Sequence, residues 1–548
     1  MKHWNVFSER QLPQKVSFYN SLTDEHISDS DYAHAQEVWS TFKIKDMGGY
    51  TDLYLKTDSN YQLDPAFYLT APSLSFDAML LKTGVQLELL ADLEIIRFIQ
   101  KGIRGGICLC STRYAQANNK YMPYHDHTEP DSFLVYIDCN NLYGYSMCQP
   151  LPVSDFRLLD QNEINLLDVM NIADDADFGF ILEVDLIYPE ELHYTHNDYP
   201  FCAEKFIPPG GKTPKLIPNL YSKYQYVIHY VHLKTCINNG LILDKIHRVL
   251  TFRQSSFLGE YINLNTELRK KAVTPFQQDL FKLLNNSVFG KTLEDSEKRT
   301  DVRLVNQWCD ESNKTNKFIS ADKLIARPNF HSATIFSENL VAVQMKPERI
   351  LLDKPIYIGF AVLELSKSHM YRFHYEIIKP YYGDTVQLCY TDTDSFVYKI
   401  ETSDFYCDLK NNFLRYFDTS NYSDDNIFGL PIKNKKIPGL FKDELGGEIM
   451  TEFVGLRSKL YCIKTESSLI KKAKGIKKNV VRDLTSSDYK SALLHDKVIR
   501  KKNILFRCIK HEIFTQNVNK IALSNSDDKR FILSDKVSTR AWGHNTIV

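Results

Sequence analysis

Residues 386–400 read Val-Gln-Leu-Cys-Tyr-Thr-Asp-Thr-Asp-Ser-Phe-Val-Tyr-Lys-Ile. Two apolar runs, rich in β-branched and aromatic residues, flank a short polar segment that contains Asp392 and Asp394. This pattern predicts a β-hairpin with acidic residues at its tip. The hairpin therefore places two carboxylates at one end of a sheet.

A second predicted strand, far upstream, also ends in a carboxylate. Residues 133–137 form a continuous apolar run, typical of a buried strand, and Asp138 follows directly. A single carboxylate at a strand end is more often a loop residue or a cap. Strands that bring Asp138, Asp392 and Asp394 to one end of a sheet can instead hold two Mg²⁺ ions, because hard oxygen ligands suit this metal. Two such ions stabilise both the attacking and the leaving oxygen of a phosphoryl transfer.

A helix predicted at 275–289 carries a second group of candidate residues. Thr274 can cap its start, and Gly290 follows its expected end. Lys282, Asn286 and Phe289 lie at i, i+4 and i+7, on one helix face. A packing face rarely includes Lys and Asn, and a solvated face rarely includes Phe. A cation, an amide and a ring together suit a nucleoside triphosphate, with the lysine meeting the phosphates as a point charge.

The remaining pattern indicates the fold class. Apolar residues between Phe360 and Ile377 recur at helical spacing, which predicts a helix over roughly 356–378 with one buried stripe. Helices and strands alternate with hairpins along the chain. This arrangement favours an α+β, palm-like core over a doubly wound sheet.

Composition sets wide limits on function. The chain has 548 residues, 43% of them hydrophobic and 25% charged, and a net charge of −1. This balance argues mildly against a nucleic-acid partner, for which a basic excess is common. Basic residues do gather in the C-terminal third, and the alternative is that these runs are solvated helix faces. The two runs are Lys471, Lys472, Lys474, Lys477, Lys478 and Arg482, and then Lys497, Arg500, Lys501, Lys502, Arg507 and Lys510.

The cysteines and the hydropathy indicate the compartment. Eleven cysteines occur without a CxxC pair, which favours reduced thiols and an intracellular protein. The N-terminal residues show no apolar signal region, and no apolar run approaches the ~18 residues of a membrane span. We therefore expect a soluble protein with no membrane partner.

Four segments resemble the motifs of family B DNA polymerases, and they occur in that family's order. Asp138-Cys-Asn-Asn-Leu-Tyr143 resembles motif A, and Lys282-Leu-Leu-Asn-Asn-Ser-Val-Phe-Gly290 resembles motif B. Tyr390-Thr-Asp-Thr-Asp-Ser395 resembles motif C, and Lys459-Leu-Tyr461 resembles the KxY motif. Four motifs in the right order are highly specific. The resemblance covers at least residues 50–548.

The resemblance implies a role for each matching residue. Asp138 and Asp394 would be the catalytic, metal-binding carboxylates, with Asp392 auxiliary. Tyr143 would be the steric gate that excludes a ribose 2′-hydroxyl. Phe289 stands where the family commonly has Tyr, so a hydroxyl contact is lost and stacking is kept. The resemblance also implies that Lys270 and Lys282 bind the triphosphate and that Asn286 and Phe289 contact the nascent base pair. Lys459 and Tyr461 would contact the primer terminus, and further DNA contacts would come from Ser287, Gly290 and Thr393.

The resemblance also implies a right-hand polymerase, with palm, fingers and thumb. The stretches at about 149–250 and 292–340 look like the two insertions of the protein-primed branch, which help to grip a terminal protein and encircle DNA. The expected domains are a truncated exonuclease remnant at 1–68, the first part of the palm with the first insertion at 69–252, the fingers at 253–291, the second insertion with the second part of the palm at 292–482, and the thumb and C-terminal region at 483–548.

The N-terminal region departs from the family pattern. Tyr54-Leu-Lys-Thr-Asp58 resembles the third exonuclease motif, but only 53 residues precede it and they contain no DxE pair. A proofreading site needs several carboxylates around two metals, so we expect no 3′–5′ exonuclease activity. Ile103-Arg-Gly-Gly106 resembles the YxGG motif, with Ile in place of Tyr.

These observations predict a template-directed DNA polymerase with two Mg²⁺ (or Mn²⁺) ions, using dNTPs and primer–template DNA. The resemblance adds a terminal (priming) protein as a partner and the genome of a virus or mobile element as the target, in the nucleus or at a viral replication site. One alternative is a catalytically inactive or domesticated DNA-binding remnant. Another is a reverse transcriptase, although those enzymes usually place two adjacent Asp residues where Thr393 separates Asp392 from Asp394.

Overall fold

A computed structural model describes residues 9–18, 27, 29–41, 44–47, 63, 67–308, 320–509 and 512–547. Within these residues the largest sheet, here called the palm sheet, has ten strands. Its main path runs β1-β13-β14-β3-β17-β18-β19. The bounds are β1 Cys108–Cys110, β13 Val386–Asp392, β14 Ser395–Glu401, β3 Ser132–Cys139, β17 Met450–Arg457, β18 Leu460–Thr465 and β19 Leu469–Ala473, with β2 Tyr114–Gln116, β15 Phe417–Asp418 and β16 Phe441–Asp443 off this path.

The predicted hairpin and the predicted upstream strand meet in the palm sheet. β13 and β14 form the antiparallel hairpin, and β3 pairs antiparallel with β14. β3 is buried along most of its length, as its apolar run predicts. Asp138 lies one residue inside the end of β3, opposite Ser395. The two strand predictions are therefore confirmed.

The two predicted helices are also present. Helix α9 spans Pro275–Thr292 and begins with a capping box between Thr274 and Gln277. It ends three residues later than expected, so Gly290 lies inside it, and the Thr292 hydroxyl donates to the Phe289 carbonyl in the last turn. Helix α11 spans Ile356–Arg372 and continues through a wide turn into α12, Lys379–Tyr382.

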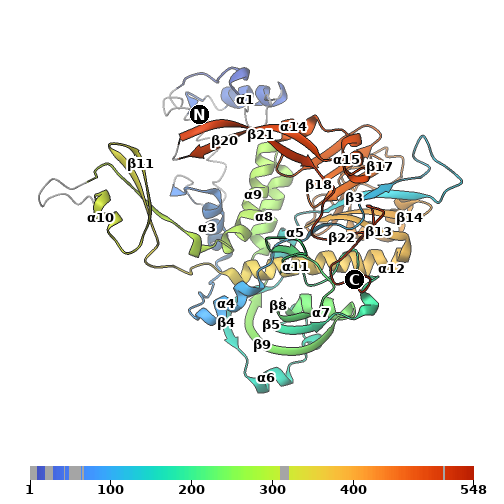
Figure 1. Cartoon of the computed structure of the whole chain (residues 1–548), viewed down its shortest axis with the longest axis horizontal. Helices are drawn as coiled ribbons and strands as arrows, with labels where there is room; N and C mark the ends of the chain where they lie inside the picture. The colour runs from blue at the N-terminus through green and yellow to red at the C-terminus, as the bar shows by residue number, and fades with distance from the viewer. Residues whose placement is uncertain are drawn as a thin grey trace, which may run out of the picture.

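Helix α11 packs against four other helices, namely α4, α5, α7 and α9. In Figure 1 it runs between the palm sheet above and a four-stranded sheet below. The lower sheet has the order β4-β9-β5-β8 and lies in the predicted first insertion. Its strands are β4 Leu151–Leu158, β9 Ile242–Ser255, β5 Phe178–Ile187 and β8 Lys223–His229, and the helices named here are α4 Leu93–Gly102, α5 Leu142–Met147 and α7 Tyr230–Asn238.

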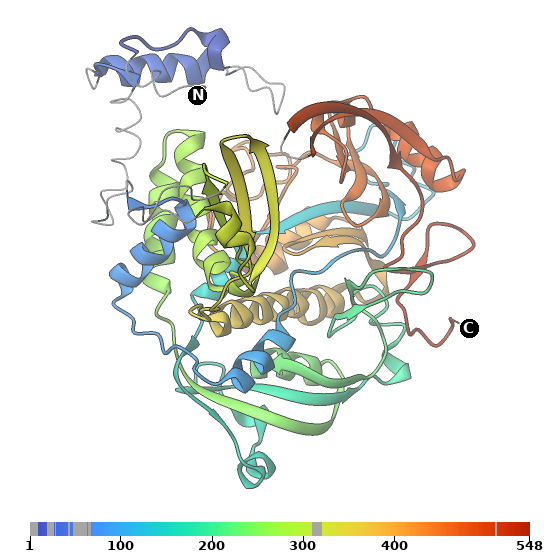
Figure 2. The same cartoon turned by 60° about the vertical axis from the view of Figure 1, so that its left-hand side comes forward.

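A three-stranded arm lies within the range of the predicted second insertion. It consists of β10 Asp301–Val305, β12 Leu340–Met345 and β11 Phe330–Ser337, with α10 Ala321–Ile325 beside them. The arm projects away from the body in Figure 1 and comes forward in Figure 2. The α+β fold class is confirmed, whereas the bounds of the five domains stay a prediction.

The C-terminal region forms a long hairpin and then returns to the palm sheet. The hairpin consists of β20 Ile499–Ile509 and β21 Glu512–Leu523. After it, Ser538 bridges to Thr112, next to β1. No helix of the described residues is long and apolar enough to span a membrane. The other elements are α1 Asp29–Thr41, α3 Ala71–Thr83, α6 Gln161–Leu166, α8 Gly259–Lys271, α13 Phe405–Asp408, α14 Lys478–Arg482, α15 Ser486–Leu494, β6 Glu204–Phe206, β7 Lys215–Ile217, β22 Phe531–Ile532 and β23 Thr539–Arg540.

Candidate active site

Asp138 and Asp394 lie side by side at the end of the palm sheet. The residue after Asp394, Ser395, pairs with Asp138 across the β14–β3 ladder. The amide of Cys139 donates to the carbonyl of Asp394 at 2.7 Å. Both acids line one cavity of about 440 Å³, here called the palm cavity. The pairing of strands distant in sequence thus brings the two predicted carboxylates together.

The hairpin tip is held in one conformation by backbone contacts. Thr393 has a positive φ of 65°, which turns the chain back within two residues. Its amide donates to the Ile107 carbonyl at 2.7 Å, next to β1. A Cβ on Gly106 would overlap the Thr393 side chain, so the glycine permits this close approach. Thr393 therefore has a local structural role, and its predicted DNA contact stays untested.

The electrostatics of the carboxylate pair favour a bound cation. Burial, then the charges of Asp394 and Glu444, raise the pKa of Asp138 to about 8. Burial and the charge of Asp392 raise the pKa of Asp394 to about 6, against the opposing effect of Lys282. A divalent cation would remove the cost of holding both groups ionised. Two carboxylates supply only part of the coordination shell of such a cation, so positions would remain for substrate oxygens.

Cations surround these acids in the palm cavity. Lys282 and Asn286 reach it from α9, and Arg269 reaches it from α8. Lys442 lies directly opposite Asp138 in the β16–β3 register, and it forms an ion pair with Glu444. A cavity lined by both acids and cations suits a polyanion that arrives with divalent cations.

Tyr143 lines the palm cavity just after Asp138 and stacks on Phe289 of α9. The ring centroids are 4.5 Å apart with an interplanar angle of 23°. Burial, then the charges of Asp394 and Asp392, raise the pKa of the Tyr143 hydroxyl to about 12, so it stays neutral. The two predicted nucleotide-binding rings therefore form one stacked unit.

Three other predicted residues of this region lie differently. Lys270 does not line the palm cavity; its ammonium group pairs with Glu267 at 2.9 Å on α8. Its neighbour Arg269 lines the cavity, and the predicted triphosphate contact of Lys270 stays a prediction. Ser287 is buried within α9, and the side of Gly290 where a Cβ would project is open.

Asp392 faces a neighbouring cavity of about 830 Å³, together with Lys459 and Tyr461. The Lys459 ammonium group donates to both Asp392 oxygens, at 2.7 and 2.8 Å, and the Lys459 backbone amide donates to the Tyr390 hydroxyl oxygen at 3.0 Å. Tyr461 packs beside Tyr390 with ring centroids 4.7 Å apart. Basic side chains of the first C-terminal run line the same cavity, namely Lys471, Lys472, Lys474, Lys478 and Arg482.

Sequence reasoning missed several residues that line the palm cavity. Asp418 is buried and accepts hydrogen bonds from the Asn140 amide and the Lys436 backbone, both at 2.7 Å. Lys436 and Lys442 line the cavity from a segment that lies outside the four motifs. The one signal that pointed to this segment was its local excess of lysine between 433 and 442.

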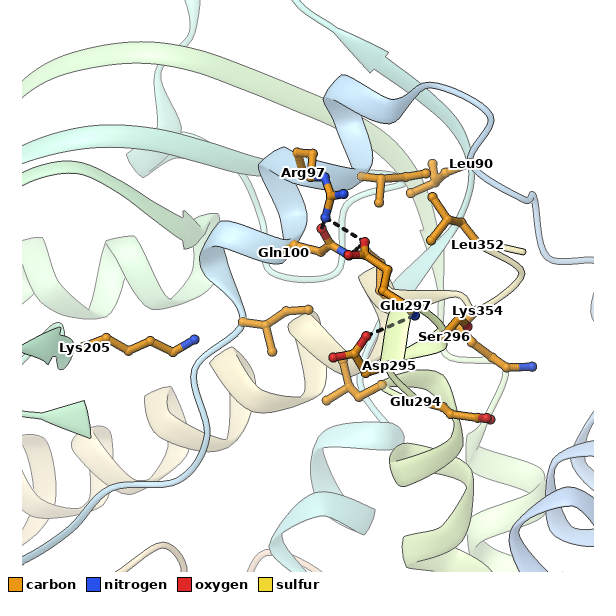
Figure 3. A pocket seen from close by; sticks show the side chains of 14 residues that line it. Leu90, Arg97, Gln100, Lys205, Glu294, Asp295, Ser296, Glu297, Leu352 and Lys354 are labelled. Carbon is orange, nitrogen blue, oxygen red and sulfur yellow. Dashed lines mark hydrogen bonds and ion pairs between the residues drawn. The ribbon is translucent and has the colours of Figure 1, made fainter. Parts of the chain in front are cut away.

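A separate cavity of about 340 Å³ lies where the base of the arm meets α4 (Figure 3). An ion pair of 2.7 Å joins Arg97 of α4 to Glu297, just before β10. Leu352 and Lys354, just before α11, lie on another side of this cavity. None of the predicted site residues lines it, so it is a structural joint rather than part of the candidate active site.

Two acids at the end of a sheet, one from β3 and one from the hairpin tip, faced by the lysine-bearing helix α9, are the arrangement expected of a right-hand nucleic acid polymerase. Residues 31–380 match the model of the family described as DNA polymerase type B, organellar and viral. The chain belongs to this family and is a DNA-directed DNA polymerase. This membership decides against the reverse transcriptase alternative. No curated protein sequence matches the chain.

The fold is similar to solved structures of Phi29 DNA polymerase. The complex with primer–template DNA and incoming nucleotide substrates is 14% identical, with a TM-score of 0.51, over 90% of this chain and 73% of that chain. The post-translocation binary complex is 13% identical with a TM-score of 0.51, over 94% and 77%. The orthorhombic form is 13% identical with a TM-score of 0.52, over 90% and 73%. At this identity the likeness shows the fold alone, and it confirms the right-hand architecture.

Proposed function

We propose that this polymerase extends a DNA primer along a template by two-metal nucleotidyl transfer, with the dNTP bound in the palm cavity. The observation that carries the proposal is the convergence of Asp138, Asp394 and Lys282 on that one cavity. The acids come from two strands of the palm sheet and the lysine comes from α9.

The donor set fits divalent cations, and the chain's own side chains position the substrates. Asp138 and Asp394 would hold two Mg²⁺ (or Mn²⁺) ions, which stabilise the attacking and leaving oxygens of the transfer. Lys282 and Arg269 would meet the triphosphate, and Asn286 would lie at the nascent base pair. The primer 3′-hydroxyl attacks the α-phosphate and pyrophosphate leaves. Catalysis then rests on positioning and on charge stabilisation.

Two aromatic residues would select the sugar. Because Tyr143 is stacked on Phe289, the ring pair would oppose movement of the Tyr143 ring when a ribose arrives. A 2′-hydroxyl would then overlap the ring, so dNTPs are preferred by shape. Lys459 and Tyr461, in the neighbouring cavity, would contact the backbone at the primer terminus, which positions the strand without reading its sequence.

The proposal includes initiation on a protein. Each insertion range predicted from the protein-primed branch forms a sheet of its own, which supports initiation on a hydroxyl of a terminal protein. The replicated genome would be that of a virus or mobile element. Loss of proofreading also stays a proposal, since Tyr54 and Asp58 lie outside the described residues.

Primer extension tests the function. With a labelled primer–template, dNTPs and Mg²⁺, we expect the wild-type protein to extend the primer and Asp138→Asn or Asp394→Asn to lose at least about 100-fold in rate while still binding DNA. Asp384→Asn, at an exposed acid before β13, is the matched control. Retained extension by either active-site variant would refute the proposal. Wild-type protein that binds DNA without extending it would support the inactive remnant instead.

A further inference from the structure

The segment that follows the C-terminal hairpin is fixed firmly against the palm sheet. Arg113 is buried; its guanidinium donates to the carbonyls of Lys536 and Leu456, both at 3.0 Å, and to that of Asn525. Arg530 is also buried and donates to the Asn197 carbonyl at 2.8 Å. Buried guanidinium groups with several carbonyl acceptors hold a segment in one position. The short segment between Asn525, which Arg113 holds, and Arg530 is therefore fixed in position.

Lys529 lies in this fixed segment, close to the catalytic hairpin. Its ammonium group donates to the Cys108 carbonyl at 2.8 Å, and Cys108 pairs with Asp392 across the β1–β13 ladder. Burial lowers the pKa of Lys529, against the opposing charges of Cys108, Asp527 and Asp392. One carbonyl satisfies only one of the three N–H groups of an ammonium, so donors remain for a further acceptor.

The ammonium group of Lys529 faces a cavity of about 870 Å³, here called the rear cavity. Its other basic lining residues are Lys215, Arg457, Lys459 and Lys474. The acids of this cavity offset only part of the positive charge. Lys215 pairs with Asp528, and burial raises the pKa of Asp527. Lys459 and Lys474 also line the cavity that contains Asp392, so the rear cavity continues directly from the expected primer terminus.

We propose that the rear cavity binds backbone phosphates of the primer strand behind its 3′ end, and that Lys529 is a phosphate-binding residue there. The inference rests on the proposed function, because a primer strand must occupy the neighbouring cavity. Phosphodiester groups fit the site because three of its cations, Arg457, Lys474 and Lys529, form no ion pair among the described residues. The other two, Lys215 and Lys459, are paired with Asp528 and Asp392. No polymerase motif predicts this role, since Lys529 belongs to the segment that follows the last of them.

The salt dependence of primer–template binding tests this inference. Lys529→Met removes the charge and keeps the length of the side chain, and Lys529→Arg restores the charge. Lys474→Met removes a second cation from the cavity, and it has an exposed side chain in the free protein. Lys298→Met, at an 84% exposed lysine outside both cavities, is the matched control. Binding is measured by fluorescence anisotropy across salt concentrations, with thermal unfolding as the check of folding.

Loss of one phosphate contact has a defined signature. We expect Lys529→Met and Lys474→Met each to weaken binding about tenfold at low salt and to reduce the slope of log K against log salt by about 0.9. Lys529→Arg should recover most of the affinity, and Lys298→Met should match wild type. Unchanged affinity in both Met variants, or weaker binding with an unchanged slope, would overturn the inference. If the wild-type protein neither binds nor extends the primer, the proposed function fails and the inference falls with it.

Modified primers locate the phosphate. Each primer carries one neutral methylphosphonate linkage, at the first to the fifth position from the 3′ end. One linkage should weaken binding to wild type, and that penalty should disappear in Lys529→Met, because the two changes remove the same contact. If, at every position, the loss of binding from the linkage is the same in Lys529→Met as in wild type, Lys529 contacts none of these phosphates.

Discussion

Asp138 and Asp394 lie side by side in the palm cavity, where burial and the charges of neighbouring acids make their ionisation costly. Their pKa values are raised to about 8 and about 6. At neutral pH and without a cation, Asp138 is therefore largely protonated. A divalent cation must displace that proton before both carboxylates can act as ligands.

Metal affinity should therefore depend on pH. We expect the apparent affinity for Mg²⁺ to rise as the pH increases from 6 to 8, because fewer protons compete for Asp138 over that range. At pH 7 binding should release up to about one proton. Calorimetric titration of the protein–DNA complex in two buffers with different ionisation enthalpies measures this release. A binding heat that is the same in both buffers would contradict the prediction.

The stacked pair of Tyr143 and Phe289 predicts how the sugar is selected. Tyr143→Val removes the ring beneath the sugar, and Phe289→Ala removes the ring that holds it in place. We expect both variants to raise the ratio of ribonucleotide to deoxyribonucleotide incorporation at least about tenfold. Tyr124→Val, at a 92% exposed tyrosine, should leave the ratio unchanged. Single-nucleotide incorporation kinetics give the ratio, and an unchanged value in Tyr143→Val would remove the gate role.

At the scale of secondary structure, the elements that position the catalytic groups were predictable because their signals are local. Three local signals each specify one element. The apolar pattern of the hairpin specifies β13, the apolar run before Asp138 specifies β3, and the cap at Thr274 specifies the start of α9. Sequence could not choose between Arg269 and Lys270. Both lie in one basic run, and only the packing of α8 beside α9 turns Arg269 toward the palm cavity.

Contacts between distant elements could not be predicted from the sequence, because they also depend on how the elements pack together. The bond between Asp392 and Lys459 joins two recognised motifs, yet it depends on how β1 lies beside both β13 and β17. Lys529 lies outside the four motifs, and its position depends on contacts with strands that are distant in the sequence. Neither spacing nor periodicity contains this information.

The contact between Gly106 and Thr393 gives a prediction for the hairpin tip. Gly106→Ala should push the tip away from β1, because the new Cβ overlaps the Thr393 side chain. We expect a loss of about 1–3 kcal/mol in the free energy of unfolding, typical of overpacking, together with reduced extension. Gly105→Ala, where a Cβ meets no neighbour, is the control. Chemical denaturation measures the loss, and equal stability of the two variants would contradict this account.

On the scale of the whole molecule, the net charge of −1 conceals a strong segregation of charge. Cations line the palm cavity, the neighbouring cavity and the rear cavity, whereas many acids form ion pairs elsewhere. The neutral balance that argued against a nucleic-acid partner is therefore compatible with a continuous basic path past the catalytic hairpin.

Buried histidines should make the whole fold sensitive to acid. Burial lowers the pKa to about 3 for His196 and to about 4 for His229, His369 and His544. The unfolded chain, with a pKa near 6.5, then binds more protons than the folded chain between pH 6.5 and about 4. Stability should therefore be full above pH 6.5 and decrease as the pH falls below it.

Thermal unfolding at pH 7.5 and pH 5 measures this loss. Asp138 and Asp394 act in the opposite direction, because their raised pKa values favour proton uptake by the folded state. The double variant Asp138→Asn, Asp394→Asn removes that opposing effect and should therefore lose more stability between the two values than wild type. An unfolding midpoint of the double variant that is the same at both pH values would contradict the prediction.

The central claim is that Asp138 and Asp394 together hold the metal ions for nucleotidyl transfer. The most direct test is a crystal structure with a dideoxy-terminated primer–template, an incoming dNTP and Mn²⁺, with the manganese located by anomalous scattering. The account predicts two manganese peaks about 3.5–4 Å apart, bound by both carboxylates and the triphosphate. Manganese bound elsewhere, with Asp138 and Asp394 both free of metal, would contradict it.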